Sequence, residues 1–186
     1  MELEEEFDRL VQTARKAGAA LRDADVPHAL GGGLAAWARG GPKTEHDIDF
    51  FVKPEDAERG LAALVEAGFR ASESLEEWLV KAYDGDVLVD LIFNPTSGPV
   101  DDDLLGRAEQ LEVAAVEMPV ATLEDVMAAK LLALSEQNPD MSSCLEIARS
   151  LREQIDWDEV RRRTEDAPFA AAFFTLVEEL GVVEPR

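Results

Sequence analysis

Two aspartates, Asp47 and Asp49, are separated by one residue and could hold a metal ion together. Apolar residues alternate with them in a pattern that predicts a strand over about 46–53. Side chains two residues apart on a strand lie on the same face, so the two carboxylates should be close neighbours. The pattern indicates either a site for a divalent cation or a solvated strand edge, where Asp-x-Asp also occurs.

A third acid, Asp90, lies inside the apolar run 87–93. A run that is apolar at successive positions is typical of a central strand buried on both faces. An ionised carboxylate is costly there unless it is paired or bound to a metal. Asp90 is therefore either a functional acid or an aspartate at a strand end that accepts hydrogen bonds from backbone amides.

A glycine cluster, Gly31-Gly32-Gly33, follows a predicted strand over 26–30 and precedes a predicted helix over 34–38. Glycines at a strand-to-helix turn let the backbone approach an anion closely. Gly33 precedes Asp47 by 14 residues, enough for a helix and a returning loop. The glycine turn and the aspartate pair could therefore open onto the same end of a sheet.

Two lysines are placed where they could serve the same site. A hairpin turn at Asp84-Gly85 would pair Lys81 with Leu88, on the sheet face of Asp90. Lys81 then either reaches a phosphate or forms an ordinary cross-strand ion pair. Lys130 lies on the apolar stripe of a predicted helix, so its ammonium either snorkels to the rim or points into a polar cavity.

The surrounding elements predict an α+β protein with a small mixed β-sheet flanked by helices and followed by a C-terminal helical segment. Before residue 118, helices are expected over 2–23 and from Pro54 to Gly68, with a further strand over about 109–116. After Pro119 the pattern is helical only, with starts near 122, 139, 156 and 168. We therefore expect a core over residues 1–118 and a helical segment over 119–186 that packs on it.

Composition narrows the possible partners. The 186 residues include 18 basic and 40 acidic ones, a formal net charge of −22, which disfavours extended contact with RNA or with an anionic membrane. The sequence has no apolar stretch of the roughly 20 residues that a membrane span needs. The single cysteine, Cys144, cannot form an internal disulfide, so a cytoplasmic protein is expected.

Taken together, Gly32-Gly33, Asp47-Ile48-Asp49 and Asp90 resemble the signature of the nucleotidyltransferase superfamily typified by DNA polymerase β. The resemblance covers roughly residues 26–134. It is strongest to small bacterial members, which include the AbiEii-type toxin-related branch and the antibiotic nucleotidyltransferases. The chain departs from the AbiEii pattern after the lysine helix, where it has Asp140 but lacks an arginine and a second aspartate.

The resemblance implies transfer of a nucleoside monophosphate from an NTP, such as ATP, to a hydroxyl or similar acceptor, with release of pyrophosphate. Two Mg²⁺ ions, or Mn²⁺, would be held by the three acids, and one of these, Asp90, could also accept the acceptor's proton. The acceptor would be a small molecule or a protein before an RNA. The alternative is a non-catalytic nucleotide- or partner-binding protein on the same fold. The residues expected to contact the nucleotide are Gly32, Gly33, Lys43, Thr44, Lys81 and Lys130.

Overall fold

The computed structural model describes residues 2–44 and 47–185, and the strands within these ranges form one mixed sheet. The strand order is β3-β4-β5-β2-β1-β7-β6. The pairs β2–β5 and β1–β7 are parallel, and the other neighbours are antiparallel. The strands are β1 (His28–Leu30), β2 (Ile48–Val52), β3 (Arg70–Ser72), β4 (Leu79–Asp84), β5 (Val87–Ile92), β6 (Glu109–Val113) and β7 (Val116–Val120).

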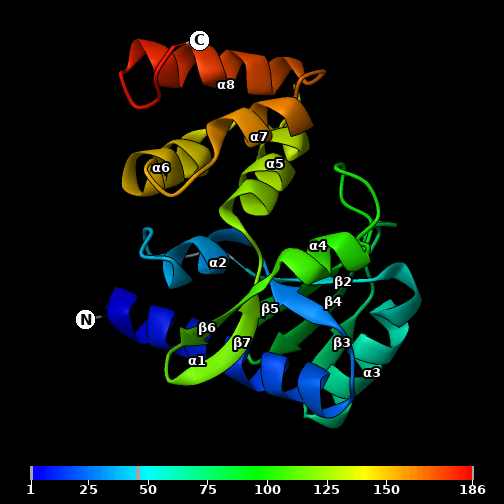
Figure 1. Ribbon diagram of the computed structural model, residues 1–186. Helices are drawn as coiled ribbons and strands as arrows, with labels where there is room; N and C mark the ends of the chain where they lie inside the picture. The colour runs from blue at the N-terminus through cyan, green and yellow to red at the C-terminus, as the bar shows by residue number, and fades with distance from the viewer. Residues whose placement is uncertain (1, 45–46, 186) are drawn as a thin grey trace.

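Helices cover both faces of the sheet, so the fold is α+β, as predicted (Figure 1). α1 and α3 contact β5 on one face, while α2 contacts β2 and α5 on the other. Figure 1 shows α6, α7 and α8 stacked beyond α2, away from the sheet. The helices are α1 (Glu2–Asp23), α2 (Gly32–Ala38), α3 (Ala57–Glu66), α4 (Asp102–Arg107), α5 (Leu123–Ala133), α6 (Ser142–Leu151), α7 (Trp157–Arg163) and α8 (Pro168–Glu179).

Alternation along β2 decides which face carries the predicted acids. Phe50 is fully buried and faces α1, where a Cβ added to Gly18 would lie 3.7 Å from its ring. Phe51 points to the opposite face, where a Cβ added to Gly31 would lie only 2.8 Å from its ring. Because Asp49 is two residues from Phe51, it shares the face that α2 covers.

Most predicted elements are found, including the helix over 2–23 and the strand that carries Asp49. That strand begins at Ile48 in the described residues, and position 46, its predicted start, lies outside them. The last helix starts at Pro168, as predicted, and Gly181 with a φ of +64° follows its end. Pro54 opens a 3-10 turn, Pro54–Asp56, that leads into α3.

The predicted turn of the β4–β5 hairpin is wrong by one residue. The two turn residues are Gly85-Asp86 instead of Asp84-Gly85, and Gly85 takes the first position with a φ of +61°, which glycine adopts without strain. Moving the turn by one residue shifts the pairing by two, so Lys81 keeps its face. It lies directly opposite Asp90, where Leu79 was expected.

The single strand predicted over 109–116 is also wrong, because the chain turns at Ala114-Ala115 and forms the hairpin β6–β7. Both alanines have positive φ values, +48° and +64°, so the turn lacks the Asn or Gly that would have marked it. The expected boundary at 118/119 falls inside β7. Two short elements, β3 and α4, are additional to the prediction, and the helix expected near Pro139 begins at Ser142.

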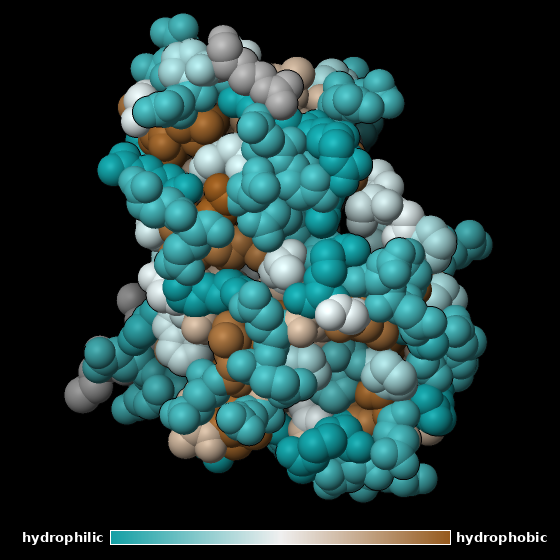
Figure 2. Space-filling model, in the orientation of Figure 1, coloured by the Kyte–Doolittle hydropathy of each residue, from teal (hydrophilic) through white to brown (hydrophobic). Residues whose placement is uncertain are grey.

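The C-terminal helices pack around α5, which contacts α6, α7 and α8. Met127 and Leu131 of α5 are fully buried, as is Phe173 of α8. On the face drawn in Figure 2 the surface is mainly hydrophilic, with hydrophobic residues in separate patches, as suits a chain with a net charge of −22. Within the described ranges, every helix is too short or too polar to cross a lipid bilayer.

Candidate active site

The site is built on one row of residues that crosses three strands and ends at the glycine turn. Asp49 of β2 is in register with Asp90 of β5, and Asp90 is in register with Lys81 of β4. On the other side of Asp49, the Gly31 backbone N–H donates to the Asp49 carbonyl oxygen over 2.8 Å. Residues in register on neighbouring strands lie roughly 5 Å apart and point to the same face. The row therefore consists, in order, of the glycine turn, two acids and a lysine.

Asp90 is the most unusual member of this row. It is only 8% exposed, and its Oδ1 atom has no hydrogen-bond partner among the residues that the structure describes. Burial, together with the smaller effect of the nearby Asp49 charge, raises the pKa of this carboxyl group to about 7, although the Lys81 charge acts in the opposite direction. Two carboxylates that disfavour each other's ionisation at a buried position suit a divalent cation, which would remove the repulsion.

Asp47 precedes β2 and is exposed. Its charge also contributes to the raised pKa of Asp90, so it lies near enough to interact with that carboxyl group. Within residues 2–44 and 47–185, no three His, Cys, Asp or Glu side chains gather closely enough to form a ready-made metal cage. The oxygen donors of Asp47, Asp49 and Asp90 are those that Mg²⁺ prefers, and their assignment as metal ligands stays a prediction.

The glycine turn lies against the acids, and two of its positions have no room for a side chain. A Cβ added to Gly32 would lie 1.9 Å from Asp49 Oδ2, and Gly32 has a φ of +57°. A Cβ added to Gly33 would lie 2.7 Å from Thr44 Oγ1. The turn is therefore in direct contact with one predicted acid and one predicted nucleotide-binding residue.

A cavity of about 530 Å³ opens beside this turn. The core contributes Gly33, Lys43 and Thr44 to its wall, and α5 contributes Lys130. The structure thus brings four of the six residues predicted to bind nucleotide to one cavity, and a fifth, Gly32, adjoins it. Lys130 lines the cavity, which is the second of the two alternatives left open by the sequence.

Lys81 lies on the other side of the two acids, away from this cavity. Its Nζ contacts Glu76 Oε1 at 3.3 Å. Burial would lower the Lys81 pKa, but the hydrogen bond that Lys81 donates to Glu76 and the charge of Asp90 outweigh this effect and raise the pKa. Lys81 therefore stays protonated beside Asp90.

Several residues of the site could not be found from the sequence. Glu76 follows a three-residue strand with no distinctive pattern, and its pairing with Lys81 depends on the loop that joins β3 to β4. The opposite wall of the cavity comes from α6 and the segment before it, whose position depends on how the C-terminal helices pack. This wall consists of Asn138, Asp140, Ser142, Ser143, Glu146 and Ile147.

Comparison with known proteins identifies related sequences and folds. The model of a family described as uncharacterised nucleotidyltransferase matches residues 7–183. The crystal structure of ANT(2″)-Ia in complex with adenylyl-2″-tobramycin superposes with a TM-score of 0.63 at 22% identity, covering 88% of this chain and 98% of the other. A solution structure of the same antibiotic-resistance factor gives a TM-score of 0.65 at 21% identity, with 92% and 96% covered.

A third solved structure, TM1012 from Thermotoga maritima, is itself assigned only as a candidate nucleotidyltransferase. It superposes with a TM-score of 0.55 at 21% identity, covering 78% of this chain and 92% of that one. A search of curated proteins found no match. At these identities the solved structures show a shared fold. The match to the family model shows which sequence family the chain belongs to.

Proposed function

This chain belongs to the family of uncharacterised nucleotidyltransferases, and we propose that it moves a nucleoside monophosphate from an NTP to a hydroxyl or similar group, releasing pyrophosphate. One observation carries the proposal. Asp49 and Asp90 lie in register beside a glycine turn, and that turn opens into a cavity lined by Lys43 and Lys130. A pair of acids next to a cavity that carries two lysines suits a metal-bound triphosphate.

Within this proposal, Asp47, Asp49 and Asp90 hold two Mg²⁺ ions, which Mn²⁺ could replace. When bound, such ions would offset the negative charge of the phosphates. The buried Oδ1 of Asp90, which has no hydrogen-bond partner among the described residues, supports its place in the site. Asp90 would also be the group that accepts the acceptor's proton.

The triphosphate would occupy the cavity beside the glycine turn. Gly32 and Gly33 offer backbone amides at positions where any side chain would collide, so phosphate oxygens can approach closely. Lys43, Thr44 and Lys130 would contact the phosphates from the cavity wall. Lys81 would act on the other side of the acids, where it offsets the charge of Asp90.

The acceptor would be a small molecule or a protein rather than an RNA, because a net charge of −22 opposes extended contact with a polyanion. The α6 wall of the cavity carries Asp140 and Glu146, which favour an acceptor with positive charge. ATP is the first donor to test, since the product complex of ANT(2″)-Ia contains an adenylyl group. The AbiEii-type assignment and the cytoplasmic location stay predictions.

We expect Asp49→Asn to abolish the reaction while the protein stays folded. Loss of one metal-binding carboxylate should lower pyrophosphate release at least ~100-fold, since metal ions supply several kcal/mol of charge stabilisation. The melting temperature without metal should stay the same or rise, because one of two repelling carboxylates is neutralised. Pyrophosphate release is measured with each NTP, Mg²⁺ and a fraction of small cell metabolites as acceptors.

Asp86→Asn is the matched control, because Asp86 is an exposed aspartate in the turn of the β4–β5 hairpin. It should keep the wild-type rate. Unchanged turnover in Asp49→Asn would rule out the proposed metal site. Mg²⁺-dependent stabilisation by an NTP without turnover on any acceptor would instead indicate a nucleotide-binding protein.

A further inference from the structure

The carboxylate of Asp125, in the first turn of α5, is buried at 6% exposure and receives hydrogen bonds from three side chains. Arg107 donates to both of its oxygens, over 2.8 and 3.2 Å. Arg163 donates to Oδ1 over 2.7 Å, and the Thr122 hydroxyl donates to Oδ2 over 2.7 Å. Such charge-assisted contacts are strong and directional, so the carboxylate is held from several sides at once.

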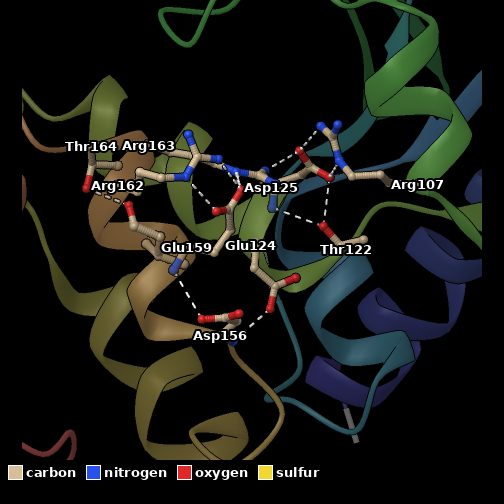
Figure 3. A network of polar contacts seen from close by, with 10 residues as sticks. Arg107, Thr122, Glu124, Asp125, Asp156, Glu159, Arg162, Arg163 and Thr164 are labelled. Carbon is tan, nitrogen blue, oxygen red and sulfur yellow. Dashed lines mark hydrogen bonds and ion pairs between the residues drawn. The ribbon is translucent and has the colours of Figure 1, made fainter.

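These contacts join three elements that are distant in sequence (Figure 3). Arg107 ends α4 and Arg163 ends α7, while Asp125 belongs to α5. The neighbouring Glu124 accepts a hydrogen bond from the backbone N–H of Asp156 at the start of α7, over 2.8 Å. The first turn of α5 therefore forms hydrogen bonds with both ends of α7 and with one end of α4.

The orientation of α5 decides where Lys130 lies. Lys130 is five residues beyond Asp125 on the same helix, a rise of roughly 7.5 Å. α5 also packs on α2, the helix that begins at the glycine turn. A tilt of α5 about its first turn would therefore move Lys130 relative to Gly33 and Thr44 across the cavity.

We infer that Asp125 is a positioning residue for the nucleotide cavity: its contacts with Arg107 and Arg163 hold α5 so that Lys130 faces the glycine turn. The inference rests on the proposed function, in which Lys130 contacts the triphosphate. The rival explanation is that apolar packing of α5, through buried residues such as Val126 and Met127, holds the helix without the carboxylate.

The first test measures the environment of Lys130 without using any activity. The chain has five lysines, so acetylation by a small reagent can be followed at each one by mass spectrometry. In Asp125→Asn we expect the acetylation rate of Lys130 to change at least threefold relative to Lys16 and Lys53. An unchanged relative rate in the folded variant would overturn the inference.

Glu178→Gln is the matched control. It removes another part-buried ion pair of the C-terminal helices, between Arg161 of α7 and Glu178 of α8. Loss of a contact that lies outside α5 should leave the Lys130 rate as in the wild type. A similar change in both variants would show that general loosening, and not Asp125, determines the position of Lys130, and the inference would fail.

The second test asks whether the position matters for phosphate binding. Inorganic tripolyphosphate with Mg²⁺ serves as the probe, and we expect its Kd to rise at least fivefold in Asp125→Asn and in Lys130→Met, but not in Glu178→Gln. If Lys130→Met binds the probe like the wild type, the proposed contact with the triphosphate is wrong. The acetylation rate alone then decides whether Asp125 positions Lys130.

Arg163→Lys provides a milder variant in case Asp125→Asn unfolds, as judged by circular dichroism. Arg163 contacts Asp125 and Glu159 at once, and one ammonium group cannot reproduce that fork. We expect the acetylation rate of Lys130 and the Kd for tripolyphosphate to change in the same direction as in Asp125→Asn, but by less. A folded Arg163→Lys protein with wild-type rates and wild-type Kd would count against the inference.

Discussion

At the scale of single residues, two positions of the site are unusual. One has no room for a side chain, and the other buries an oxygen that has no hydrogen-bond partner among the described residues. Gly32 lies so close to Asp49 that a Cβ would overlap the carboxylate, and Asp90 buries an oxygen that has no hydrogen-bond partner among the described residues. Such arrangements are costly in a protein that only has to fold. They therefore support the proposal that this part of the sheet binds a ligand.

The raised pKa of Asp90 predicts how the metal-free protein responds to pH. In the unfolded chain an aspartate ionises near ~3.9, whereas Asp90 in the folded protein ionises near 7. Between these values the folded state holds the extra proton, so this group lowers the free energy of unfolding as pH rises from about 4 to 7. The expected loss is on the order of a few kcal/mol.

Asp90→Asn removes this dependence, because an amide does not titrate in this range. In EDTA, we expect the variant to melt above the wild type at pH 8, by a margin that becomes smaller at pH 5. Thermal unfolding of both proteins across this range checks the prediction, with Asp86→Asn as the control that should follow the wild type. A constant difference between Asp90→Asn and wild type at every pH would contradict it.

At the scale of elements, the turns show how local sequence and backbone conformation can disagree. The β4–β5 hairpin has glycine at a turn position with positive φ, as local rules require. The β6–β7 hairpin instead uses Ala114 and Ala115 there, although alanine is strained in this region. Tertiary packing must therefore hold that turn, since β7 is an inner strand that pairs with β1.

Ala114→Asn combined with Ala115→Gly should relieve this strain. We expect the free energy of unfolding to rise by about 1 kcal/mol or slightly more, because both new residues tolerate positive φ. For a chain of this size the melting temperature should then rise by about 2–4 °C. Ala172→Gly, at an exposed position inside α8, should do the opposite and lower the stability. A destabilised double variant would contradict the assigned turn.

At the scale of the whole molecule, charge is the dominant feature. A net charge of −22 implies self-repulsion that the ion pairs of the surface only partly offset. The basic residues are outnumbered, and several lie at the cavity beside the glycine turn or at the Asp125 contacts that join α4, α5 and α7. The protein therefore combines an acidic exterior with a small number of specific basic sites.

We expect moderate salt to stabilise the protein. Raising NaCl from 20 mM to 500 mM should raise the melting temperature, because the Debye length falls to only a few ångströms and repulsion is screened. Replacing the exposed Glu4, Glu5 and Glu6 of α1 by Gln reduces the charge magnitude by three and should flatten the salt dependence. A melting temperature that falls with salt would mean that ion pairs outweigh the repulsion.

Local features could be predicted from the amino-acid pattern: the strand that carries Asp49, the glycine turn, the long α1 and the helix caps at Thr122 and Asp156. These features follow from side-chain alternation, backbone freedom and capping, which act within a few residues. The amino-acid sequence also indicates which acids could be functional. An ionised aspartate inside an apolar strand, such as Asp90, has a high free-energy cost of burial wherever that strand lies.

Which of these residues lie close together could not be predicted without the three-dimensional arrangement of the strands and helices. Asp49 and Asp90 come into register because β2 and β5 pair in parallel across intervening elements, and no local pattern sets the register of such a pair. The α6 wall of the cavity and the contacts of Asp125 depend likewise on how helices pack over long distances in the chain. This packing results from the burial of apolar faces between elements. The sequence of one segment alone cannot specify it, because each face is buried by residues of another segment.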